Sequence, residues 1–74
     1  MTTGERVKEL RNALNLTQTE FGSRIGVSRN SVASYESGVR NMNDYILKNI
    51  CRTFNADYFW LTEGKGNMFL ELPD

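Results

Sequence analysis

The chain has 74 residues, with nine basic and nine acidic side chains, one cysteine and no histidine. This length accommodates one small domain with a modest hydrophobic core. The composition excludes an internal disulfide and the usual zinc-binding frameworks. The sequence carries no signal peptide and no apolar run of membrane-spanning length, so we expect a cytoplasmic protein in a reducing compartment.

Charge is distributed unevenly although the formal net charge is zero. Residues 1–40 contain six basic and four acidic side chains, whereas residues 53–74 contain one and four. A neutral chain does not by itself indicate nucleic-acid binding. The asymmetry would nevertheless let the first part face phosphate and the last part face away from it.

The first predicted helix begins near Thr2, which has capping-box spacing to Glu5. Val7 and Leu10 then recur at helical spacing, as expected for a buried stripe. Asn15 is suited to a left-handed residue that ends the helix.

A second helix is predicted from the capping box formed by Thr17 and Glu20, and it ends at Gly26. Ser28 caps a third helix, which ends at Ser37-Gly38. Because only residues 26–28 separate these two helices, they must cross at a sharp angle.

Two more helices follow a loop at residues 41–43. The fourth carries apolar residues from Ile46 to Phe54, and we expect Cys51 on its face to be a buried small apolar residue. A short fifth helix begins at Asp57. The segment after residue 66 is unexpectedly apolar.

The segment of residues 17–36, TQTEFGSRIGVSRNSVASYE, resembles the helix-turn-helix motif of the Cro and repressor family of bacteria and their phages. Gln18 opens its first helix, Gly22 lets the two helices approach closely, and Gly26 adopts the turn conformation. The likeness covers about residues 4–64. It also includes segments 6–11, 36–38 and 57–64, the last with one residue more before its tryptophan. The resemblance implies an all-α fold, a compact five-helix bundle of the lambda-repressor-like DNA-binding type.

In this family the second helix of the motif enters the major groove. The positions that match its base-reading residues are Arg29, Asn30, Ala33 and Ser34. Arginine pairs bidentately with guanine and asparagine with adenine, while an alanine can contact the methyl group of thymine. We therefore expect these side chains to carry sequence specificity.

A larger set of positions matches family contacts to the DNA backbone, which position the protein without reading sequence. They are Thr17, Gln18, Arg24, Ser28, Ser31, Arg40, Asn41 and Asn43. Thr17 and Ser28 are required as helix caps in any case. Asp44 departs from the basic residue that some relatives place near this position, which weakens phosphate contact there.

Arg11 and Glu36 match a family pair that forms a largely buried ion pair between the first and third helices. We assign this pair a structural role. If it is buried, loss of one partner should destabilise the domain by about 3–5 kcal/mol.

We divide the chain into a helix-turn-helix domain, residues 1–66, and an apolar tail, residues 67–74. The tail is interpreted as a dimerisation segment or as the start of a linker to a further domain, and both alternatives stay open. The expected dimer interface consists of Trp60, Met68, Phe69, Leu70 and Leu72.

The resulting functional hypothesis is a sequence-specific transcriptional regulator, a repressor, from a bacterium or a prophage. It would bind double-stranded operator DNA as a homodimer, with half-sites about 34 Å apart. The alternative is a protein-recognition or antitoxin-like module built on the same domain. We expect no enzyme activity, cofactor, metal, membrane or small-molecule ligand, because no catalytic set or phosphate loop is evident.

Overall fold

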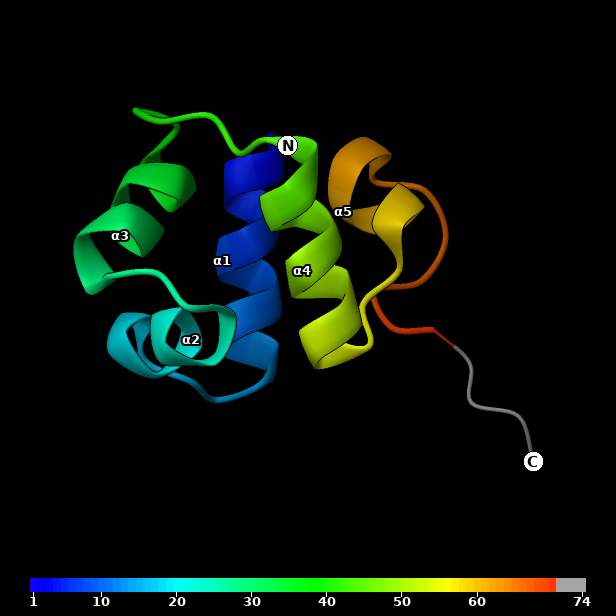
Figure 1. The fold of residues 1–74 in the computed structure, drawn as a ribbon. Helices are drawn as coiled ribbons and strands as arrows, with labels where there is room; N and C mark the ends of the chain where they lie inside the picture. Colours follow the sequence, from blue (N-terminus) through cyan, green and yellow to red (C-terminus); the bar gives the residue numbers. More distant parts are fainter. Residues whose placement is uncertain (71–74) are drawn as a thin grey trace.

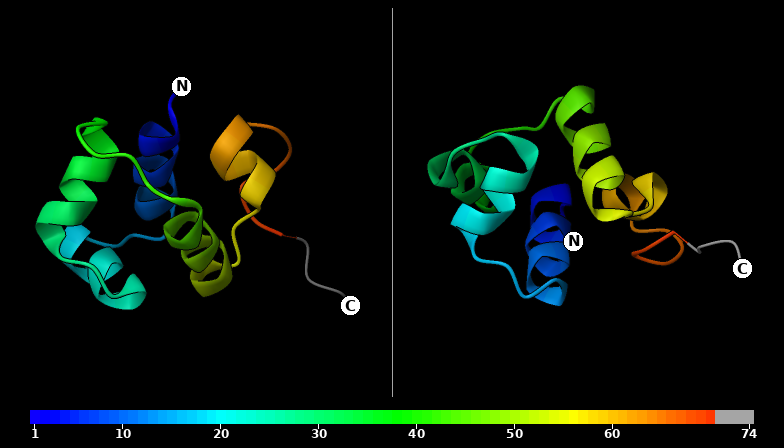
Figure 2. Two further views of the ribbon diagram at one scale, coloured as in Figure 1. Left: turned by 45° about the horizontal axis from the view of Figure 1, so that its top comes forward. Right: turned by 60° about the horizontal axis from the view of Figure 1, so that its bottom comes forward.

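A computed structural model describes residues 1–70, and these residues form five helices (Figure 1). The helices are α1 (Thr3–Ala13), α2 (Gln18–Ile25), α3 (Arg29–Ser37), α4 (Asp44–Phe54) and α5 (Tyr58–Glu63). α1 lies between the α2–α3 pair and the α4–α5 pair (Figures 1 and 2). The predicted all-α, five-helix architecture is confirmed.

Every helix begins at a side chain that accepts a hydrogen bond from a backbone amide of its first turn. The N-caps are Thr2, Thr17, Ser28, Asn43 and Asp57. Both predicted capping boxes are complete: Thr17 Oγ1 accepts from the amide of Glu20 at 3.1 Å, and Glu20 Oε1 accepts from the amide of Thr17 at 2.9 Å. The caps satisfy amides that have no partner within the helix.

The hydrophobic core draws on all five helices. Its fully buried large side chains are Val7, Leu10, Phe21, Val32, Ile50 and Leu61. The rings of Phe21 and Phe54 stack with their centroids 4.7 Å apart, which joins α2 to α4. Because α1 supplies Val7 and Leu10 to this core, it forms the support against which both helix pairs pack.

Two glycines allow helices to approach more closely than any side chain would permit. A Cβ atom on Gly22 would lie 2.5 Å from the Val27 carbonyl oxygen, as expected for the crossing of α2 and α3. A Cβ atom on Gly4 would overlap the carbonyl oxygen of Tyr35, at the contact between α1 and α3. The first of these close contacts was predicted from the sequence, whereas the second was not.

Arg6 is a buried cation that the sequence analysis did not single out. Its guanidinium donates to the carbonyl oxygens of Leu61 at 2.7 Å, Thr62 at 2.8 Å and Met1 at 2.8 Å. The first two acceptors lie in the last turn of α5, where carbonyl groups lack helical partners. Arg6 thus ties α1 to the C-terminal end of α5, where the helix dipole favours a positive charge.

The fifth helix buries one of two adjacent aromatic side chains and exposes the other. Trp60 is only 9% exposed and belongs to the core, whereas its neighbour Phe59 is 62% exposed. Trp60 therefore has little surface to offer to a dimer partner, contrary to its expected place in the interface. Cys51 is half-buried rather than buried.

Residues 67–70 pack against the domain from which the sequence analysis had separated them. The Asp57 amide donates to the Met68 carbonyl at 2.9 Å, and the Leu70 amide donates to the Asn55 carbonyl at 3.0 Å. Met68 is half-buried against the core. The tail thus begins as part of the folded unit, while Leu72 lies outside the described residues.

Among the helices of residues 1–70, none combines the length and the apolar character needed to cross a membrane.

Candidate nucleic-acid interface

The α2–turn–α3 unit is fixed by a short, hydrogen-bonded turn. Gly26 ends α2 in the left-handed region with φ 78°, and the Val27 amide donates to the Gly22 carbonyl at 2.9 Å. Asn49 of α4 donates through Nδ2 to the Ile25 carbonyl at 3.0 Å. The geometry of the turn is therefore held by the helix behind it as well as by its own residues.

The N-terminal turn of α3 presents the two predicted base-reading side chains with the longest reach. Arg29 and Asn30 are both exposed, whereas Ala33 and Ser34, one turn later, are half-buried. Buried Val32 and Tyr35 hold the opposite face of α3 in the core. The outward surface of α3 is therefore polar. Its long side chains, Arg29 and Asn30, are at the start of the helix, and its short ones, Ala33 and Ser34, follow one turn later.

The ion pair between Arg11 and Glu36 is present and largely buried. Arg11 Nε lies 2.7 Å from Glu36 Oε2 and Nη2 lies 3.1 Å from Oε1, with side-chain exposures of 12% and 5%. The hydrogen bond to Glu36 raises the pKa of Arg11, against the opposing effect of burial. Arg11 also donates to the Leu16 carbonyl at 2.9 Å, which fixes the loop before α2.

Gln18, predicted to contact phosphate, is half-buried at the start of α2. Its Nε2 donates to Glu36 Oε1 at 3.2 Å, so its amide is held by the residue that also pairs with Arg11. This bond was not predicted from the sequence, because the two residues lie on different helices, 18 positions apart.

A second group of predicted backbone-contacting residues lies along α3: Ser28 and Ser31 are at its start, and Arg40, which follows its C-terminal end, reaches back to Ser31. Arg40 Nη1 donates to Ser31 Oγ at 3.2 Å, and the guanidinium lies 5.4 Å from the centroid of the Tyr35 ring. Ser28 Oγ donates to Ser31 Oγ at 3.2 Å and accepts from the Ser31 amide at 3.1 Å. Arg40 is thereby held next to α3 while remaining exposed.

The remaining predicted backbone-contacting side chains are exposed but do not form one cluster. Arg24 lies in the last turn of α2, and Asn41 lies in the loop after α3. Asn43 Oδ1 accepts from the Ile46 amide at 2.9 Å, so this side chain is already used as the cap of α4. Thr17 is likewise used as the cap of α2.

Asp44, which we expected to oppose phosphate, is engaged by two partners. Lys48 Nζ lies 3.0 Å from Oδ2, and the Tyr58 hydroxyl donates to Oδ1. The bond from Tyr58, followed by that from Lys48, lowers the pKa of Asp44, and the same bond raises the pKa of Tyr58. The carboxylate is thus bonded within the α4–α5 half of the molecule.

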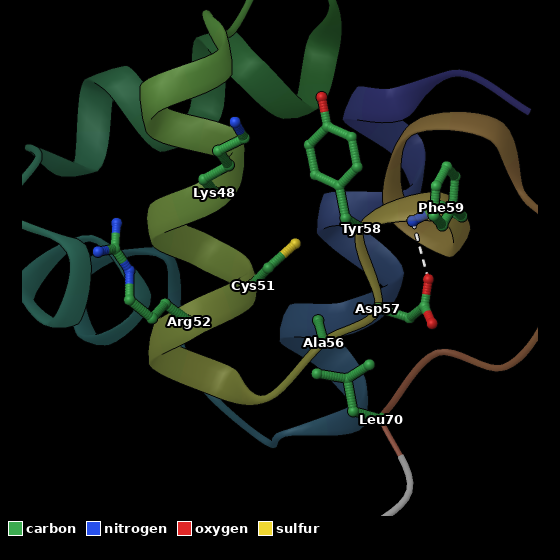
Figure 3. Close-up of a pocket in the computed structure, with 8 residues that line it drawn as sticks. All are labelled: Lys48, Cys51, Arg52, Ala56, Asp57, Tyr58, Phe59 and Leu70. Carbon is green, nitrogen blue, oxygen red and sulfur yellow. Dashed lines mark hydrogen bonds between the residues drawn. The ribbon is translucent and has the colours of Figure 1, made fainter.

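A shallow pocket of about 570 Å³ lies between α4, α5 and residue 70, and the sequence analysis did not predict it. Its lining residues are Lys48, Cys51, Arg52, Ala56, Asp57, Tyr58, Phe59 and Leu70. Arg52 lies on one side of the pocket and Asp57 on the other, with Cys51 and Ala56 between them (Figure 3). Burial, followed by the nearby charge of Asp57, raises the pKa of the Cys51 thiol.

Within residues 1–70, no group of three or more histidine, cysteine, aspartate or glutamate side chains could hold a metal ion.

Comparisons with known proteins identify the family and the fold. The helix-turn-helix family model matches residues 7–61. The antitoxin PezA of Streptococcus pneumoniae is 40% identical over 55 residues, which are 74% of this chain. The chain spans only 35% of the length of PezA. YgzD of Bacillus subtilis, an uncharacterized HTH-type transcriptional regulator, is 36% identical over 61 residues, covering 78% of this chain and 92% of YgzD.

Two solved structures share the fold. The P22 c2 repressor, in complex with a synthetic operator, superimposes with a TM-score of 0.80 at 23% identity, covering 88% of this chain and 98% of that one. The restriction-modification controller protein C.AhdI of Aeromonas hydrophila gives a TM-score of 0.74 at 27% identity, covering 80% and 86%. The chain therefore belongs to the helix-turn-helix family, and its fold is that of the Cro and repressor type.

Proposed function

We propose that this chain is a sequence-specific DNA-binding transcription regulator, of the repressor kind, that inserts α3 into the major groove. The observation that carries the proposal is the exposure of Arg29 and Asn30 at the first turn of a helix whose opposite face is buried. Membership of the helix-turn-helix family and the likeness to HTH-type regulators support it.

Each exposed side chain at the start of α3 matches one kind of base edge. Arg29 can donate two hydrogen bonds to O6 and N7 of guanine, and Asn30 can bond N6 and N7 of adenine. A good bidentate pair contributes about 1–3 kcal/mol of discrimination. Ala33 and Ser34, being half-buried and short, would add contacts only where the groove floor comes close to the helix.

Backbone contacts would come from both ends of the α2–α3 unit. Arg40 and Arg24 are exposed cations that can bind phosphate oxygens, and Gln18 and Asn41 are neutral donors. Thr17, Ser28, Ser31 and Asn43 already serve caps or local bonds, so we assign them weaker roles. Such contacts fix the position of α3 without reading sequence.

We propose that the regulator binds a pseudo-palindromic operator as a homodimer, because a chain with zero net charge gains little affinity from bulk electrostatics. The pocket between α4 and α5 is the proposed dimer interface. In a two-fold pairing across this pocket, the Arg52 side of one copy faces the Asp57 side of the other. Phe59 and Leu70, which line the pocket, are exposed and supply apolar area to this surface.

An antitoxin-like role is the second candidate, favoured by the 40% identity to the antitoxin PezA over 55 residues. In that case the same pocket would receive a partner protein instead of a second copy. DNA binding and a protein partner are compatible, so the two candidates differ in what occupies the α4–α5 surface.

Selection of binding sites from a random duplex pool tests the proposal, first at low salt and then at physiological salt. Enrichment of an inverted repeat, with half-sites about one helical turn apart, is the expected result. Salt-sensitive binding without any preferred sequence would contradict specific recognition by this chain. No binding at low salt would reject DNA recognition and favour the protein-binding candidate.

A further inference from the structure

Glu36, at the end of α3, receives three hydrogen bonds from two other helices. Arg11 of α1 donates from Nε at 2.7 Å and from Nη2 at 3.1 Å, and Gln18 of α2 donates from Nε2 at 3.2 Å. Glu36 is 9% exposed as a whole residue, so its carboxylate is a buried group that connects α1, α2 and α3 through hydrogen bonds. Gln18 is the only one of these three residues that we also assign to the DNA surface.

The chemistry of the carboxylate determines which end of the Gln18 amide faces it. An ionised carboxylate only accepts hydrogen bonds, so it holds the NH₂ end and repels the carbonyl end. One N–H of that NH₂ group is used by Glu36, and the other N–H remains available as a donor. A phosphate oxygen is also only an acceptor, so a phosphate contact needs that second N–H.

We propose that Glu36 is a positioning residue for the contact between Gln18 and a DNA phosphate. By fixing the orientation of the Gln18 amide, it keeps the second N–H available at the start of α2. The inference rests on the proposed function, because it presumes that Gln18 contacts the DNA backbone. What it adds is a role in binding for a residue that the sequence assigned only to stability.

The arrangement also links the two parts of the motif. Glu36 belongs to the recognition helix and Gln18 to the start of the helix before it, so a phosphate bound by Gln18 is connected through Glu36 to α3. The charge of Glu36 is offset by the bidentate Arg11, so the carboxylate can lie close to this surface with little repulsion of phosphate.

Bulk electrostatics predicts the opposite effect of neutralising Glu36. Replacing Glu36 with glutamine raises the net charge by one and by itself should strengthen binding to a polyanion. The positioning role predicts weaker binding, because the new amide no longer dictates how the Gln18 amide is oriented. The two explanations therefore differ in the sign of the change.

A double-mutant cycle of Glu36→Gln and Gln18→Ala tests the inference. Affinity is measured by fluorescence anisotropy with a labelled duplex of mixed sequence, at low salt and at a temperature where circular dichroism shows all four proteins folded. We expect Gln18→Ala to weaken binding about tenfold and Glu36→Gln to weaken it about fivefold when Gln18 is present. In the Gln18→Ala background, Glu36→Gln should leave binding unchanged or strengthen it.

If Glu36→Gln changes the DNA affinity by the same factor when Gln18 is present and in the Gln18→Ala background, the positioning role is overturned. It is also overturned if Glu36→Gln strengthens DNA binding when Gln18 is present. If the wild-type chain binds no duplex, both the proposed function and the inference that rests on it are rejected. Wild-type binding without coupling rejects the inference alone.

Nuclear magnetic resonance of the wild-type chain gives a test that survives misfolding of the Glu36→Gln variant. In the free folded protein, one of the two Gln18 side-chain amide protons should be displaced downfield from its position in the urea-unfolded chain, because it is bonded to Glu36. Addition of the duplex should move the other proton. Amide protons of Gln18 that resonate where they do in the urea-unfolded chain, or a shift of the Glu36-bonded proton alone on addition of the duplex, would overturn the inference.

Discussion

The half of the molecule formed by α2 and α3 and the half formed by α4, α5 and residues 67–70 are held together in different ways. The first half depends on caps, a glycine turn and a buried ion pair, and its outer surface is polar. The second half depends on contacts between distant segments, and it exposes Phe59 and Leu70 around a pocket. A polar, rigid surface suits base and phosphate contacts, whereas an apolar, hollowed surface suits another protein chain.

The largest expected effect comes from opening the ion pair in the first half. Glu36→Ala leaves the Arg11 guanidinium buried without its acid, so we expect a loss of about 3–5 kcal/mol in unfolding free energy. Urea denaturation measures it. Asp44→Ala is the control, because its pair with Lys48 is exposed on both sides. Equal losses in the two variants would contradict the view that burial makes the first pair important.

The second largest effect is expected from a substitution at the crossing of α2 and α3. A methyl group in Gly22→Ala would press on the Val27 carbonyl, so we expect a loss of about 1–3 kcal/mol and weaker DNA binding. The neighbouring exposed residue offers a control, Ser23→Ala, expected within about 0.5 kcal/mol of the wild type. Thermal unfolding compares them, and an unchanged melting temperature in Gly22→Ala would show that the crossing can relax.

A change in the second half should alter self-association and leave the fold intact. Phe59→Ser removes an exposed aromatic beside the pocket, so we expect dimerisation to weaken about tenfold in analytical ultracentrifugation. Val39→Ser removes an apolar side chain that is even more exposed, in the loop after α3 and far along the chain from the pocket, and it should leave association unchanged. A wild-type chain that remains monomeric, or equal effects of both changes, would exclude this surface.

The smallest expected effect concerns the contact between α4 and α5. The Tyr58 hydroxyl helps to lower the pKa of Asp44, so the stability that this carboxylate contributes is present above its ordinary pKa and is lost as the pH falls through the lowered value. Tyr58→Phe should raise the pKa of Asp44, as followed by NMR titration. The DNA affinity should not change, and a change would show that the two halves are coupled.

The first half could be predicted well because its determinants are local or carried by the family resemblance. Thr17, Glu20 and Gly26 act within one helix, so their spacing fixes the start and the end of α2. The pairing of Arg11 with Glu36 spans 25 residues and was predicted only from the resemblance. The bond between Gln18 and Glu36 could not be predicted, because it depends on how two helices meet.

The second half could be predicted less well because its determinants are long-range. Arg6 donates hydrogen bonds to carbonyl oxygens 55 and 56 residues away. Because every residue has a backbone carbonyl group, the sequence does not indicate which ones accept these bonds. α5 has only six residues, too few for helical periodicity to decide whether Phe59 or Trp60 faces inward. The return of residues 67–70 to Asn55 and Asp57 likewise has no local signal.

The most direct test of the central claim compares the base preferences of the wild type, Arg29→Ala and Arg40→Ala on sites selected from a random pool. Arg29→Ala should relax one base position in each half-site, at a cost of about 1–3 kcal/mol for the preferred base. Arg40→Ala should weaken all sites equally and reduce the slope of affinity against salt by about one. If Arg29→Ala behaves like Arg40→Ala and leaves every base preference intact, α3 does not read sequence through Arg29, and the account is contradicted.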